Sequence, residues 1–178
     1  MPERDGARRE VKAALTAIAL SLNLVLIDAV VKELAIAFLM GRPAVPVIPG
    51  LFDLAYVENR GCAWGLLQGH SAALAAFGAA ALAFLVWKRR SVFGPSSSLC
   101  GFLAEPFLYA GILGNLIDRV FRGHVIDMFD FHWKTSHFPC FNAADAFICL
   151  SVGLLLLAPL VERREADGPA ESGPGGRS

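Results

Sequence analysis

Acidic side chains in or beside apolar segments are the part of this 178-residue sequence that could perform chemistry. The five candidates are Asp28, Asp118, Asp127, Asp130 and Asp145. Two carboxylates that share one site do not both ionise easily, so one of them tends to keep its proton. Such a pair can hold a single proton and activate a water molecule. Residue type and spacing alone leave open which two of the five would form the pair.

Several of these acids also have a purely structural interpretation. Asp28 and Lys32 are spaced i, i+4 and share one helical face, so they can form an ion pair that orients their helix. Asp118, at the C-terminal end of a predicted helix, opposes the helix dipole and needs a cationic partner, which we expect across the bundle. Asn142 and Asp145 suit the first turn of a helix, as N-cap and dipole partner.

Other chemistries fit the residue pattern less well. The histidines His124, His132 and His137 occupy one loop, without an HExxH motif or a Cys/His zinc spacing, so a metal site is not favoured. Cys62 and Cys140 fall in two loops where a disulfide between them is an open alternative. The 16 basic residues balance the 16 acidic ones, which gives no basis for nucleic-acid binding.

The elements that must position the acids are long apolar segments. The hydrophobic fraction is 55% and the charged fraction only 18%, whereas ordinary soluble domains are ~45–50% apolar and ~25% charged. A bilayer core of ~30 Å needs ~20 mostly apolar helical residues. We therefore predict an all-α membrane protein with four transmembrane helices, at about 13–38, 71–87, 99–117 and 141–161. Because three spans follow the first, we interpret that segment as a span and not as a cleavable signal peptide.

Clusters of lysine and arginine predict the orientation. They precede the first span, separate the second from the third and follow the fourth, at 4–12, 88–90 and 163–164. The positive-inside rule then places both termini in the cytoplasm and the loops 41–70 and 118–140 outside. In the first outer loop three prolines exclude helix, and we predict short strands at 52–58 and 62–67 as a small sheet on the outer membrane surface. The stretch 124–132 is predicted to re-enter the interface. Residues 1–164 would form one domain and 165–178 a disordered tail.

Five blocks of the sequence, in this order, resemble the lipoprotein signal peptidase (signal peptidase II) family. They are Asp28-Ala-Val-Val-Lys32, Val57-Glu-Asn59-Arg-Gly61-Cys-Ala-Trp-Gly65, Gly114-Asn115-Leu-Ile-Asp118-Arg119, His124-Val-Ile-Asp127-Met-Phe-Asp130-Phe and Phe138-Pro-Cys-Phe-Asn142-Ala-Ala-Asp145. Each block alone is weak, but their order and their places relative to the spans make the match specific. The sequence departs from the family pattern at Arg60, Cys62 and Trp64, where that pattern has Thr, Ala and Phe.

The resemblance implies an intramembrane aspartic endopeptidase with a small outer, periplasmic-side β-cradle and with Asp127 and Asp145 as the catalytic pair. The residues implied to bind substrate or support the pair are Asp28, Lys32, Asn59, Gly61, Asn115, Asp118, Arg119 and Asn142. It further implies no metal or organic cofactor, a bacterial inner-membrane location and an active site near the outer face. The substrates would be prolipoproteins, cut just before a cysteine that carries diacylglyceryl. The alternative is a non-enzymatic membrane scaffold, or a proton-linked transport subunit, that uses the same buried acids.

Overall fold

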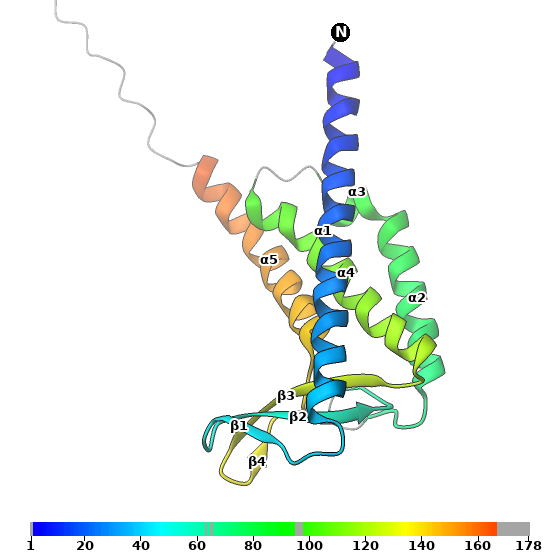
Figure 1. The fold of residues 1–178 in the computed structure, drawn as a ribbon. Helices are drawn as coiled ribbons and strands as arrows, with labels where there is room; N and C mark the ends of the chain where they lie inside the picture. Colours follow the sequence, from blue (N-terminus) through cyan, green and yellow to red (C-terminus); the bar gives the residue numbers. More distant parts are fainter. Residues whose placement is uncertain (1, 63, 65, 95–97, 167–178) are drawn as a thin grey trace, which may run out of the picture.

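Five helices stand on one side of a small antiparallel sheet in the computed structural model of the chain, which describes residues 2–62, 64, 66–94 and 98–166 (Figure 1). The helices are α1 (Pro2–Leu39), α2 (Ser71–Trp87), the short α3 (Arg89–Val92), α4 (Leu99–Phe121) and α5 (Ala143–Ala166). The strands are β1 (Val45–Ile48), β2 (Phe52–Asn59), β3 (Val125–Trp133) and β4 (Ser136–His137). The predicted tail from 167 onward lies outside the described residues, and α5 continues through the first two residues of the expected tail, 165 and 166.

Three of the described helices are long and apolar enough to cross a membrane. The qualifying stretches are Glu10–Leu39 of α1, the whole of α4, and Ala143–Arg163 of α5. Helix α2 carries no charge, but its 17 residues are few for a membrane span. The span predicted at 71–87, and with it the total of four spans, therefore stays a prediction. Helix α1 begins at Pro2, well before the predicted start, because alanine, glutamate and arginine extend a helix readily beyond the apolar run.

Helix α4 lies at the centre of the bundle and packs against α1, α2 and α5. A side chain at Gly111 would place its Cβ 2.5 Å from the Ala144 carbonyl oxygen, so α5 approaches the backbone of α4 closely. The buried Ser151 hydroxyl donates to the Ala104 carbonyl oxygen at 2.6 Å, which adds a hydrogen bond between the same two helices. This close packing fixes the start of α5 against α4, where two of the candidate acids lie.

Glu105, an acid inside α4, is held by a specific partner. Its carboxylate is 6% exposed and accepts two hydrogen bonds from the Arg89 guanidinium of α3. A bidentate arginine–carboxylate pair of this kind is strong because both charges and both geometries match. Glu105 thus attaches the segment after α2 to the bundle, and Arg89 balances its negative charge.

The sheet has the order β1-β2-β3-β4, and each pair of neighbours is antiparallel. The strand predicted at 52–58 is confirmed as β2. The strand predicted at 62–67 is wrong at residues 62, 64, 66 and 67, while residues 63 and 65 lie outside the described part of the chain. Trp64 and Leu67 have φ angles of 62° and 56°, in the left-handed region that a strand cannot use. The partner of β2 is instead β3, with Val57 opposite Asp127.

The stretch 124–132, predicted to re-enter the membrane interface, forms most of β3, and its place relative to the membrane stays a prediction. It pairs with β2 on one side and β4 on the other, which satisfies its backbone groups by hydrogen bonds within the sheet. Its side chains Ile126 and Met128 are buried against Ala35 and Leu39 near the end of α1. Because side chains alternate along a strand, the same contact points Asp127 to the other face.

Candidate active site

Asp145 is positioned by the cap of α5. The Asn142 side-chain oxygen accepts a hydrogen bond from the Asp145 backbone N–H at 3.0 Å, and the Asp145 carboxylate accepts one from the Asn142 N–H at 3.2 Å. This reciprocal pair is a capping box, in which two otherwise unpaired N–H groups are satisfied. The structural role predicted for these residues is therefore confirmed, and the cap also holds the Asp145 carboxylate in one place.

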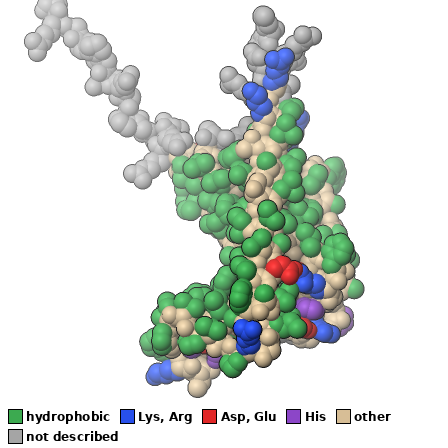
Figure 2. All heavy atoms as spheres, viewed as in Figure 1, with side chains coloured by type: hydrophobic (Ala, Val, Ile, Leu, Met, Phe, Trp, Pro, Cys, Tyr) green, Lys and Arg blue, Asp and Glu red, His purple; other side chains and the backbone are tan. Residues whose placement is uncertain are grey.

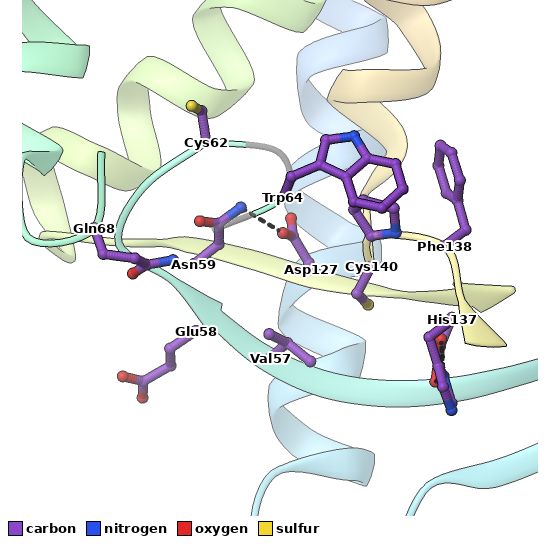
Figure 3. A pocket seen from close by; sticks show the side chains of 12 residues that line it. Val57, Glu58, Asn59, Cys62, Trp64, Gln68, Asp127, His137, Phe138 and Cys140 are labelled. Carbon is purple, nitrogen blue, oxygen red and sulfur yellow. Dashed lines mark hydrogen bonds and ion pairs between the residues drawn. The ribbon is translucent and has the colours of Figure 1, made fainter. Parts of the chain in front are cut away.

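Asp127 reaches the same region from β3, with only 1% of its surface exposed. One carboxylate oxygen accepts a hydrogen bond from the Asn59 amide at 2.9 Å, as Figure 3 shows. The other accepts from the Asn142 amide at 2.6 Å. The β2–β3 register places Val57 opposite Asp127, so Asn59 lies two residues further along β2 on the same face.

A chain of asparagine amides connects the two acids. Asn115 of α4 donates to Asp145 Oδ1 at 2.7 Å, and its own side-chain oxygen accepts from the Asn142 amide at 3.2 Å. The same Asn142 amide nitrogen also donates to Asp127. Asp127 and Asp145, from a strand and a helix, thus belong to a single hydrogen-bond network.

The acid–base properties of Asp127 differ from those of an ordinary aspartate. Burial, and after it the charge of the nearby Asp145, raises the pKa of Asp127 from 3.8 to about 7. The amides of Asn59 and Asn142 act in the opposite direction, since they stabilise the ionised carboxylate. A carboxyl with this pKa can carry a proton near neutral pH, as a general acid in a carboxylate pair must.

Lys32 is the centre of a second cluster that supports the first. It is 1% exposed, and its ammonium nitrogen lies 2.8 Å from Asp28 and 2.8 Å from Asp118. The predicted Asp28–Lys32 pair is confirmed, and Lys32 is the partner that Asp118 was expected to find across the bundle. Asp28 also accepts a hydrogen bond from the Ala144 N–H at 2.9 Å, so this cluster ties α1 to the first turn of α5.

Arg119 and Gly61 connect α4 to the segment after β2. The Arg119 guanidinium donates to the Gly61 carbonyl oxygen at 3.1 Å and to the Asn115 carbonyl oxygen at 3.3 Å. A Cβ at Gly61 would lie 2.3 Å from the Leu66 carbonyl oxygen, so this position has no room for a side chain. Among the described residues Arg119 Nε is buried without a hydrogen-bond partner.

Asp127 lines a surface pocket of about 460 Å³, whose walls come from β2, the segment after it and the stretch between β4 and α5 (Figure 3). Trp64 and Phe138 line it too, with ring centroids 6.1 Å apart. Sequence reasoning did not select Phe138 or Gln68 as site residues, because an isolated phenylalanine or glutamine has no spacing that indicates a pocket. The fifth acid, Asp130, lines the same pocket but pairs with His137 at 2.9 Å.

The two loop cysteines are free thiols on the same pocket, so the disulfide left open above is not formed. Burial and the charge of Asp127 raise the pKa of the Cys140 thiol to about 12. A thiol with so high a pKa stays protonated at neutral pH and is a poor nucleophile. Carboxylates remain the groups of this pocket that are suited to chemistry.

Known proteins are similar to this chain over most of its length. Residues 20–161 match the family model described as signal peptidase (SPase) II. The chain is 42% identical over 137 residues to the lipoprotein signal peptidase of Syntrophotalea carbinolica, covering 75% of this chain and 84% of that protein. It is 37% identical over 150 residues to the lipoprotein signal peptidase of Geobacter sulfurreducens, covering 80% and 92%.

A solved structure is also similar to this fold. It is described as a bacterial membrane enzyme solved by the in meso method, is 30% identical in sequence and superposes with a TM-score of 0.69. The similarity covers 87% of this chain and 93% of the solved chain. The family match, the identity to two peptidases and the shared fold extend over most of the sequence. The chain therefore belongs to the signal peptidase II family.

Proposed function

We propose that this chain is an aspartic endopeptidase that removes signal peptides from prolipoproteins, with Asp127 and Asp145 as its catalytic pair. The observation that carries the proposal is the amide network that joins these two carboxyls beside an open pocket. Membership of the signal peptidase II family supports the reaction and the substrate class. The alternative of a scaffold or transport subunit has no comparable support.

In the proposed mechanism the two carboxyls divide the acid and base roles. Asp127, whose pKa is about 7, carries the proton and donates it to the oxygen of the scissile carbonyl. Asp145 removes a proton from the attacking water, and that proton then passes to the leaving amine. The amides of Asn59, Asn115 and Asn142 hold both carboxyls in position before the substrate arrives.

The supporting cluster has a positioning role in this proposal. Lys32 balances one of the two negative charges of Asp28 and Asp118, and Arg122 pairs with Asp118 at 3.1 Å. Asp28 in turn holds the start of α5 through the Ala144 N–H. Arg119 would hold the segment after β2 against α4, because its guanidinium donates to the Gly61 carbonyl oxygen. Gly61 has no side chain, so the Leu66 carbonyl oxygen can lie close to its Cα in the segment that lines the pocket.

The membrane arrangement is part of the proposal. We infer four transmembrane helices, both termini in the cytoplasm, and the sheet and pocket at the outer, periplasmic face of a bacterial inner membrane. The dense basic clusters at 4–12, 88–90 and 163–164 support this orientation. A reporter fused after residue 166 should give a cytoplasmic signal and one inserted within 41–44 an external one. The reverse pattern would contradict the orientation and the outer location of the site.

The proposed substrate carries diacylglyceryl on the cysteine that follows the scissile bond. The catalytic pair is tested by Asp127→Asn and Asp145→Asn in purified protein, with cleavage of a diacylated prolipoprotein as the measurement. Each change should abolish cleavage while the protein still folds, and the double variant should be no worse than either single one.

The matched control is Asp130→Asn, which changes an acid of the same strand that lies outside the amide network. This variant should keep substantial activity, whereas Asp118→Asn should have intermediate activity, because its role is support. Near-normal cleavage by either Asp127→Asn or Asp145→Asn would exclude the proposed pair.

A further inference from the structure

A continuous strip of aromatic rings leads away from the catalytic pocket across the sheet. The aromatic strip consists of Phe52, Phe131, Phe141, Phe138 and Trp64, in this order. Successive ring centroids lie 4.5, 5.9, 6.1 and 6.1 Å apart, within the range of direct ring contact. Phe52 and Phe131 are register partners on β2 and β3, and their rings are stacked.

The strip lies on the same face of β3 as the catalytic acid. Side chains two and four residues along a strand point the same way, so Phe129 and Phe131 follow Asp127 on that face. At the other end, Trp64 and Phe138 line the pocket together with Asp127 (Figure 3). The strip is therefore continuous with the site where the substrate is cut.

These rings are more exposed than packing within the sheet requires. Phe131 is 40% exposed, Phe138 56% and Trp64 72%. Contiguous exposed apolar surface in a folded protein commonly marks a site for an apolar ligand or partner. The molecule is also hollowed between α5 and the sheet on the face seen in Figure 2, and hydrophobic side chains border the hollow on both sides.

We infer that the aromatic strip binds an acyl chain of the diacylglyceryl group on the substrate cysteine. This inference rests on the proposed function, in which that cysteine is the residue directly after the scissile bond. When the bond lies at Asp127 and Asp145, the lipid begins beside the pocket, and the strip is the exposed apolar surface that continues from there. The four phenylalanine rings offer contact without hydrogen-bonding demands, which suits a hydrocarbon chain. The strip thus makes the enzyme selective for long acyl chains.

The test compares two versions of one prolipoprotein peptide, whose cysteine carries either dihexanoylglyceryl or dipalmitoylglyceryl, at a fixed detergent composition. Wild-type protein should have the higher kcat/KM on the long-chain substrate. Phe131→Ala should lower that value about ten-fold, the effect of uncovering roughly two methylene groups. The loss should appear mainly in KM, because the contact is equally present before and during the reaction. Cleavage of the short-chain substrate should be unchanged, which shows that the variant is folded.

Two further variants separate a chain contact from a general effect. Phe131→Leu keeps an apolar side chain and should retain most of the long-chain preference. Phe77→Ala removes a phenylalanine of α2 that is 74% exposed and lies outside the strip, and it should change neither substrate.

An equal loss by Phe131→Ala on both substrates, or no loss on either, would overturn the acyl-chain site. Equal kcat/KM of wild-type protein on the two substrates would overturn it as well, while leaving the proposed peptidase function intact. Failure of wild-type protein to cleave either substrate would instead remove the proposed function, and the acyl-chain site with it.

Discussion

Replacing Asp127 with asparagine is expected to abolish cleavage and yet stabilise the folded protein at alkaline pH. Asp127 is 1% exposed, and its pKa is raised from 3.8 to about 7, first by burial and then by the charge of Asp145. A carboxyl with a raised pKa in the folded state holds its proton more tightly there than in the unfolded chain. Its contribution to stability is fully present below about pH 4 and is lost as the pH rises through about 7.

The size of this effect follows from the pKa. Raising a pKa from 3.8 to about 7 corresponds to roughly 4 kcal/mol of folding free energy. Ionisation of Asp127 therefore makes wild-type protein less stable at pH 8.5 than at pH 4 by roughly that amount. Asparagine cannot ionise, so Asp127→Asn escapes this loss. Its amide cannot accept hydrogen bonds from both Asn59 and Asn142, which costs about 1 kcal/mol at every pH. The variant should therefore be about 3 kcal/mol more stable than wild type at pH 8.5.

The measurement is thermal unfolding of both proteins in one detergent between pH 5 and pH 8.5. For a chain of this length, 3 kcal/mol corresponds to roughly 6–12 °C in melting temperature, with the variant higher at pH 8.5. At pH 5 the difference should be much smaller, because wild-type Asp127 is then protonated. Melting curves that stay parallel for the two proteins across the whole pH range would refute a buried Asp127 with a raised pKa.

Three further outcomes are expected. Cleavage by wild-type protein should fall as the pH rises through about 7, because Asp127 then loses the proton that the pair needs; initial rates that increase from pH 7 to 9 would contradict this. Lys32→Met leaves two buried carboxylates without their shared ammonium and should destabilise the protein by roughly 3–5 kcal/mol in thermal unfolding; an unchanged melting temperature would exclude that role. Gly114→Ala places a Cβ 2.5 Å from an Asp28 carboxylate oxygen and should cost roughly 1–3 kcal/mol. Gly153→Ala, whose Cβ has nothing within 4 Å inside α5, is the matched control and should not lower stability, because alanine favours a helix more than glycine does.

Some features of this molecule are determined by short stretches of sequence and were predicted from them. The helices α1, α4 and α5 were predicted because about twenty consecutive apolar residues can satisfy their backbone groups only within the segment itself. The cap at the start of α5 was predicted because Asn142 and Asp145 lie within one turn. The Asp28–Lys32 pair was predicted for the same reason, since helix geometry alone places those side chains together.

The sheet was predicted less well, because strand pairing joins residues that are distant in sequence. The segment 62–67 has the composition of a strand, but its described residues 62, 64, 66 and 67 belong to no strand, and two of them adopt left-handed backbone angles. The stretch 124–132 was predicted to re-enter the membrane interface, and no strand was predicted there. It becomes β3 because it finds two neighbouring strands and buries Ile126 and Met128 against α1.

The sequence by itself determined that this protein has long apolar helices with aspartates at their ends, and its motifs resemble those of one peptidase family. Only the tertiary structure decided which aspartates lie together. It joins Asp127 to Asp145 through the amides of Asn115 and Asn142, and it makes Lys32 the partner of an acid 86 positions further along the chain. The physical reason is that charge neutralisation and hydrogen bonding in a buried site depend on distances of about 3 Å. Such distances between different elements are set by helix packing and strand register, which local sequence patterns do not encode.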